Sequence, residues 1–76
     1  MEKQLSELKP SDKGIIKLIK SGPTLKRKLL DMGIVPGSQL EVIRVAPFGD
    51  PVEVKIKGYN LSLRKEEAKQ ISIEVI

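Results

Sequence analysis

The stretch from residue 23 to residue 37 reads Pro23-Thr24-Leu25-Lys26-Arg27-Lys28-Leu29-Leu30-Asp31-Met32-Gly33-Ile34-Val35-Pro36-Gly37. Leu25, Leu29 and Met32 recur in it at the spacing of one helix face. The basic run at residues 26–28, together with Asp31, occupies most of the other side. This pattern predicts a short amphipathic α-helix over residues 23–32, with an apolar stripe that packs on the rest of the fold.

The residues around this stretch predict where the helix begins and ends. Ser21 or Gly22 can cap its start, where a proline is tolerated in the first turn. Gly33 fits the left-handed position after the last helical residue, and Ile34 then falls where a Schellman motif places its apolar contact. Pro36-Gly37 suits the central positions of a type II turn, so we expect the chain to leave the helix sharply.

Outside this stretch the chain is divided by Gly and Pro into short segments with the composition of β-strands. Five strands with one helix inserted after the first predict a mainly β fold. We expect a small closed barrel, because closure removes exposed strand edges. The predicted segments are an irregular lead-in at residues 5–13, strands at Gly14–Lys20, Gln39–Ala46, Val52–Lys57, 61–63 and 71–75, and one helical turn at most within Lys65–Gln70.

The predicted strand Gln39–Ala46 changes its alternation half-way. Leu40 and Val42 fall on one face, and Ile43 and Val45 fall on the other. A switch of this kind predicts a β-bulge, at which the strand bends and serves both halves of a small barrel.

The composition excludes several classes of function. The 76 residues include no His, Cys or Trp, so a zinc site of the usual kind, a Ser-His triad, a cysteine nucleophile and a disulfide are all ruled out. We therefore expect a non-enzymatic single domain over residues 1–76 without catalytic, cofactor-binding or metal-binding residues. No secretory signal and no run of 18 apolar residues is present, which indicates a cytoplasmic protein without direct membrane insertion.

The basic run Lys26-Arg27-Lys28 is the first candidate for a functional surface. The chain carries 14 Lys and Arg against 10 Asp and Glu, a net charge of +4. The run is either a solubilising helix face or a docking patch for an acidic partner. Nucleic acid is the weaker alternative, because Phe48 and Tyr59 are the only aromatic residues available for stacking. Leu30 lies off the apolar stripe, so it either widens the buried face or is partly exposed.

Two further features have plainer interpretations. Phe48 lies at the tip of a predicted turn, where it either caps the barrel, which we favour, or stands exposed as an anchor for a partner. The carboxylates show no spacing typical of metal ligands and are interpreted as solvated surface charge.

Four segments of the chain, in order, resemble the FeoA family of small proteins of bacterial ferrous iron uptake. Residues 25–37 are similar to the family's LxxxLLxMGhxPG core, where h is hydrophobic. The other three are Leu5-Ser6-Glu7-Leu8-Lys9-Pro10, Val42-Ile43-Arg44-Val45-Ala46-Pro47-Phe48-Gly49-Asp50-Pro51 and Gly58-Tyr59-Asn60-Leu61-Ser62-Leu63-Arg64-Lys65-Glu66-Glu67-Ala68. Phe48 departs from the pattern, in which leucine is commoner.

This resemblance implies an SH3-like barrel and a non-enzymatic partner of FeoB, the membrane ferrous iron transporter, on its cytoplasmic side. An alternative is a metal-responsive SH3-like domain, related to the C-terminal domain of iron-dependent repressors. For the docking function we expect five residues to contribute, either directly or by holding the helix in place: Lys26, Lys28, Leu29, Leu30 and Met32. The resemblance leaves the oligomeric state open.

Overall fold

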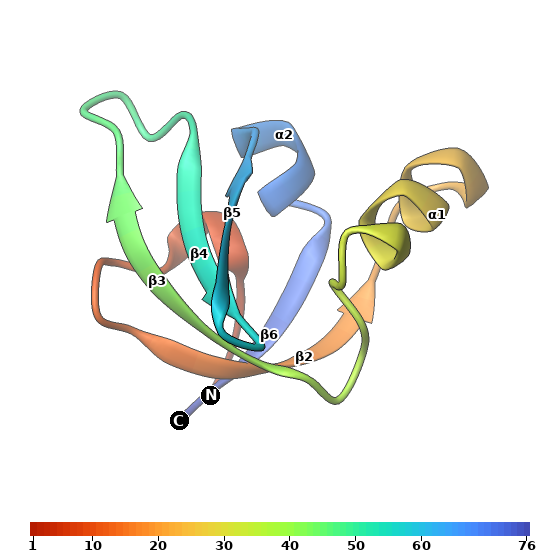
Figure 1. The fold of residues 1–76 in the computed structure, drawn as a ribbon, viewed down its shortest axis with the longest axis horizontal. Coiled ribbons are helices and arrows are strands. Elements are labelled where there is room, and N and C mark those ends of the chain that lie inside the picture. Colours follow the sequence, from red (N-terminus) through yellow and green to blue (C-terminus); the bar gives the residue numbers. More distant parts are fainter.

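Six antiparallel strands form one strongly curved sheet around a single core (Figure 1). The computed structural model describes residues 1–76. The strand order is β1-β6-β2-β3-β4-β5. The strands are β1 (Glu2–Gln4), β2 (Lys13–Ile19), β3 (Gln39–Val45), β4 (Val52–Ile56), β5 (Tyr59–Leu63) and β6 (Ile71–Val75).

Strand β1 is absent from the sequence prediction. Its three residues, Glu2–Gln4, are polar and exposed, so they carry no apolar alternation that would indicate a strand. These residues form a strand because their backbone pairs with that of β6, where Lys3 lies opposite Ile73. The expected closure is also incomplete, because β1 and β5 are the two ends of the strand order and do not pair with each other.

Three short helices join or cover the strands: the 3-10 turn η1 (Leu5–Glu7), α1 (Pro23–Asp31) and α2 (Lys65–Ala68). Helix α1 connects β2 to β3 and projects from one side of the sheet, while α2 lies at the end of the barrel away from the two termini (Figure 1). The helix predicted at residues 23–32 is therefore confirmed, and it follows the second strand because β1 precedes it.

The core is apolar and draws on every strand except β1. Val52, Val54 and Ile56 of β4 alternate inward with exposed or half-buried residues between them, as the sequence predicts. The fifteen buried apolar residues are Leu5, Leu8, Ile16, Ile19, Leu29, Ile34, Leu40, Val42, Val52, Val54, Ile56, Leu63, Ala68, Ile71 and Ile73.

The predicted bulge in β3 is present. The pairing of β3 with β4 shifts register between Val42 and Arg44, which leaves Ile43 without a partner. The expectation that Ile43 and Val45 share a face is wrong, because the extra residue reverses the alternation. Ile43 is 40% exposed, whereas Val45 lies opposite Val52 and packs against the core.

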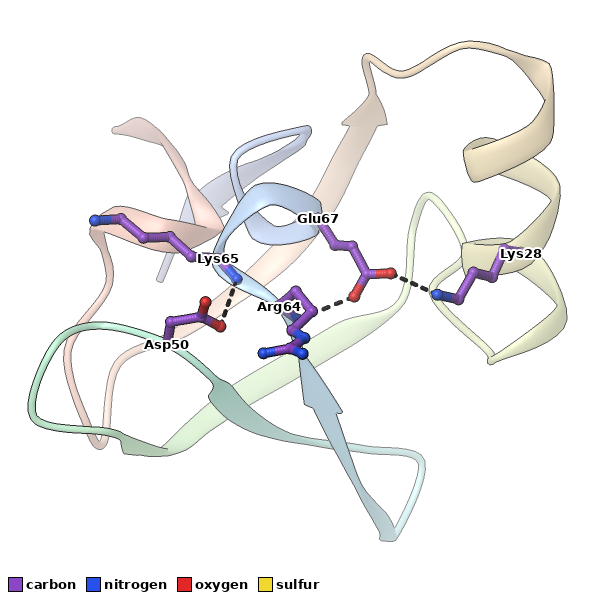
Figure 2. Close-up of polar contacts among 5 residues, drawn as sticks. All are labelled: Lys28, Asp50, Arg64, Lys65 and Glu67. Carbon is purple, nitrogen blue, oxygen red and sulfur yellow. Dashed lines mark hydrogen bonds and ion pairs between the residues drawn. The ribbon is translucent and has the colours of Figure 1, made fainter.

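Phe48 does not cap the barrel, and the prediction we favoured for it is wrong. Its side chain is 92% exposed at the tip of the β3–β4 turn. The turn is fixed by a bond from the backbone N–H of Gly49 to the oxygen of Ala46 (2.7 Å) and by Asp50, whose Oδ1 accepts the backbone N–H of Lys65 (3.1 Å; Figure 2). This end of the barrel is covered by α2 instead.

Candidate docking surface on helix α1

Helix α1 is fastened to the core at its C-terminal end. The backbone N–H of Ile34 donates to the oxygen of Leu29 (2.9 Å), and that of Gly33 donates to the oxygen of Leu30 (3.0 Å). These two bonds are those of the predicted Schellman motif, and the paired apolar residues Leu29 and Ile34 are both fully buried. Leu29 is the one fully buried residue of the helix itself.

Gly33 is required at this end for two reasons. Its φ of +96° lies in the left-handed region that favours glycine. In addition, a Cβ atom at this position would overlap the hydroxyl oxygen of Tyr59. The close approach brings β5 against the end of α1, although the two segments are far apart in the sequence.

The five predicted docking residues do not share one face of α1. Successive residues turn by about 100° around a helix, so residues four apart lie on the same side. Lys26 and Leu30 therefore lie on one flank of the buried Leu29, and Lys28 and Met32 lie on the other. We call these the Lys26/Leu30 flank and the Lys28/Met32 flank.

The Lys28/Met32 flank is engaged within the molecule. The Nζ of Lys28 donates to Oε2 of Glu67 on α2 at 2.8 Å (Figure 2). The hydroxyl of Tyr59 donates to the backbone oxygen of Met32 at 3.0 Å. Met32 itself is half-buried and packs against the core. This flank therefore holds the helix in place.

Glu67 is the group through which the two helices are linked. Its side chain is only 12% exposed, and its Oε1 also accepts the backbone N–H of Arg64 at 2.9 Å. The hydrogen bond from Lys28, followed by the one from Arg64, lowers the pKa of Glu67 below its ordinary value of 4.5. The carboxylate is therefore charged at neutral pH and fixed between α1 and α2.

The Lys26/Leu30 flank has no partner within the molecule. Lys26 is exposed and forms no ion pair. Leu30 is 37% exposed, which settles the question that its position off the apolar stripe left open. Val35, just beyond the helix, is 36% exposed. An exposed lysine one turn from an exposed leucine is a combination that a partner surface can cover.

An open hollow of about 660 Å³ lies along the other side of α1. It includes both residues of the Lys28/Met32 flank, and its wide mouth gives a ligand little enclosure. The lining residues are Pro23, Thr24, Arg27, Lys28, Asp31 and Met32.

Two residues that shape this site were missed by sequence reasoning. Tyr59 holds the end of α1 and Glu67 holds its side, across 27 and 39 positions of the chain. No local pattern predicts contacts at such separations.

No group of three or more Asp or Glu side chains gathers as metal ligands do, and no helix has the length and apolar character needed to cross a membrane.

The curved six-stranded sheet and the helix inserted after β2 define a small, mainly β protein with an SH3-like fold. The chain belongs to the FeoA family, since the family model "FeoA domain" matches residues 3–75. Members are non-enzymatic accessory proteins of ferrous iron transport, so the prediction that the chain is not an enzyme is confirmed.

Relatives in this family include one much longer protein. The chain is 38% identical over 73 residues to the Fe(2+) transport protein A/Fe(2+) transporter FeoB fusion protein of Porphyromonas gingivalis. That match covers 96% of the chain but only 9% of the fusion protein. The FeoA region of this relative is thus joined to a FeoB transporter in a single polypeptide.

Solved structures agree with the fold over its whole length. The crystal structure of an iron uptake regulatory protein (FeoA) is 30% identical, with a TM-score of 0.93 and complete coverage of both chains. The solution structure of iron(II) transport protein A from Clostridium thermocellum is 43% identical, with a TM-score of 0.92 over 97% of this chain and 46% of that one.

A more distant structure supports the fold alone. The zinc-complexed FeoA of Stenotrophomonas maltophilia, described as an SH3 domain protein, is 24% identical with a TM-score of 0.80, over 97% of this chain and 89% of that one. The SH3-like fold expected from the resemblance is confirmed.

Proposed function

We propose that the chain docks on the cytoplasmic side of a FeoB-type ferrous iron transporter and supports or regulates it. The observation that carries this proposal is the fusion relative, in which a region 38% identical to the chain is covalently joined to FeoB. Two proteins that are fused in one organism commonly work together in another as separate chains. The partner is thus a transporter whose metal cargo is ferrous iron.

The Lys26/Leu30 flank of α1 is the docking surface in this proposal. Lys26 supplies a positive charge to an acidic partner surface, and Leu30 supplies an apolar contact next to it. Lys28 and Met32 contribute by fixing the helix, since both are already bound to other elements. Leu29 contributes indirectly, because its buried side chain anchors the helix to the core.

A titration followed by NMR tests this function. The 15N-labelled chain is titrated with the isolated cytoplasmic domain of its cognate transporter, with and without guanine nucleotide. Shifts are expected to cluster on Lys26, Leu30 and Val35, and a dependence on nucleotide would indicate regulation. The absence of any shift at several hundred micromolar partner would contradict docking on this domain, and shifts confined to the opposite side of the barrel would contradict the assigned surface.

A further inference from the structure

The sheet has two edge strands, and they differ in how well they are protected. Strand β1 is three residues long and carries Glu2 and Lys3, which are typical features of an edge that resists pairing. Strand β5 reads Tyr59-Asn60-Leu61-Ser62-Leu63, with no charged residue and no proline. Strand β5 pairs with β4 alone and is the last strand in the sheet order. The edge of β5 is therefore open to a further strand.

The pairing with β4 determines which backbone groups of β5 are free. The hairpin turns through Lys57 and Gly58, both with positive φ, so Ile56 and Tyr59 form the hydrogen-bonded pair next to the turn. The alternation of an antiparallel ladder then directs the N–H and C=O groups of Asn60 and Ser62 away from β4. No backbone bond outside the sheet and no side chain reaches them.

The side chains of β5 leave this edge accessible. Tyr59 is 43% exposed, Asn60 and Ser62 are exposed, and Leu61 is half-buried. Only Leu63 is fully buried. A strand laid along this edge would gain backbone hydrogen bonds and would also cover apolar area of Leu61 and Tyr59.

The charges at the two ends of β5 indicate which kind of strand fits its open edge. Lys57 stands at one end of β5 and Arg64 at the other, and neither forms an ion pair. A second copy of β5 would bring only the same two basic residues, Lys57 and Arg64, to the ends of the paired strands. Self-pairing therefore gains no ion pair at either end, whereas acidic residues on a partner segment would.

We propose that the β5 edge binds an extended segment of a partner protein, with β-forming residues at its centre and Asp or Glu at both ends. The central residues of the segment pair with Asn60 and Ser62, and its acidic ends meet Lys57 and Arg64. This surface is separate from the Lys26/Leu30 flank, so the inference goes beyond the transporter-docking function and does not depend on it.

A peptide selection on the whole chain tests the proposal. Random twelve-residue peptides displayed on phage are selected against the immobilised 76-residue chain. The enriched peptides are expected to share a β-branched or aromatic centre with acidic residues at both ends. In the chain saturated with such a peptide, hydrogen exchange of the Asn60 and Ser62 amides is expected to slow at least tenfold.

The substitution Ser62→Pro removes only the outward N–H, because proline is tolerated on an edge whose N–H faces solvent. It is expected to weaken binding of the enriched peptide about tenfold or more, whereas the control Ser62→Ala keeps the N–H and binds as the wild type does. Arg64→Glu should also weaken binding, less so at 500 mM salt than at 50 mM. If Ser62→Pro does not fold, Arg64→Glu and the exchange rates decide the matter.

Three results would overturn the inference. These are failure of the selection to enrich any peptide, enriched peptides that bind Ser62→Pro as tightly as Ser62→Ala, and peptides whose affinity is unchanged by Arg64→Glu while the Asn60 and Ser62 amides exchange as in the free chain.

Discussion

The sheet and helix α1 are held in place in different ways. The inner strands are bonded to a neighbour on each side, and their apolar residues alternate into one core. Helix α1 depends on the buried Leu29 with Ile34, the Lys28–Glu67 ion pair and the bond from Tyr59 to Met32. The stability of the sheet is spread over many backbone hydrogen bonds, whereas the position of the helix depends on a few side chains. Single substitutions can therefore test the contribution of those side chains separately from that of the free Lys26/Leu30 flank.

The largest effect is expected from removing the helix anchor. Leu29→Ala should lower the free energy of unfolding by about 2–5 kcal/mol, because it empties a fully buried site. Urea unfolding measures the loss, and hydrogen exchange should show it first in α1. Leu30→Ala, one residue along on the exposed flank, is the matched control and should cost less than about 1 kcal/mol. A loss below about 1 kcal/mol for Leu29→Ala would show that the helix is held by something else.

A smaller effect is expected at the C-terminal end of α1. Gly33→Ala and Gly37→Ala both place a side chain at a φ near +95° (96° and 94°), a strain of about 1–2 kcal/mol each. Only Gly33 faces Tyr59, and the space at Gly37 is empty. Gly33→Ala should therefore be the more destabilising by at least about 1 kcal/mol.

The added loss at Gly33 can be traced to the tyrosine hydroxyl. In the Gly33→Ala background, Tyr59→Phe removes the overlapping oxygen and should restore part of the stability in thermal or urea unfolding. Equal losses for Gly33→Ala and Gly37→Ala would contradict a close contact between β5 and the end of α1.

The smallest effect is expected from the ion pair between the helices. The pKa of Glu67 is lower in the folded chain than its ordinary value of 4.5, so its contribution is fully present above about pH 4.5. The contribution is lost as the pH falls through the lower folded value. Because Lys28 is 61% exposed, the pair should be worth no more than about 1 kcal/mol.

Lys28→Met isolates this contribution. The stability difference between wild type and Lys28→Met should be measurable at pH 7 and should shrink as the pH falls below about 4.5, as followed by urea unfolding at a series of pH values. A difference that persists undiminished at low pH would mean that Lys28 stabilises the chain through packing of its methylene groups rather than through Glu67.

The elements that could be predicted from the sequence are those set by local patterns. The helix, its Schellman end at Gly33 and Ile34, the inward face of β4 and the β3 bulge all follow from periodicity and turn chemistry. Strand β1 could not be predicted, because its pairing with β6 involves residues some 70 positions away and leaves no apolar pattern. Phe48 was misjudged, since the place we expected it to fill is covered by α2.

The candidate site shows the same division. The sequence indicates which residues form α1 but not how the helix is rotated against the barrel. That rotation is fixed by Tyr59 and Glu67, and it places Lys28 and Met32 against the molecule while Lys26 and Leu30 stay free. Whether those two residues bind the transporter stays a prediction.

The most direct test of that central claim compares three variants of wild-type stability. The quantity measured is the affinity of each for the transporter's cytoplasmic domain. Lys26→Glu and Leu30→Ala change the free flank, and Lys3→Glu makes the same charge reversal on β1. We predict that calorimetry will show at least tenfold weaker binding for both flank variants and wild-type affinity for Lys3→Glu. Wild-type affinity for both flank variants would contradict docking through this face of α1.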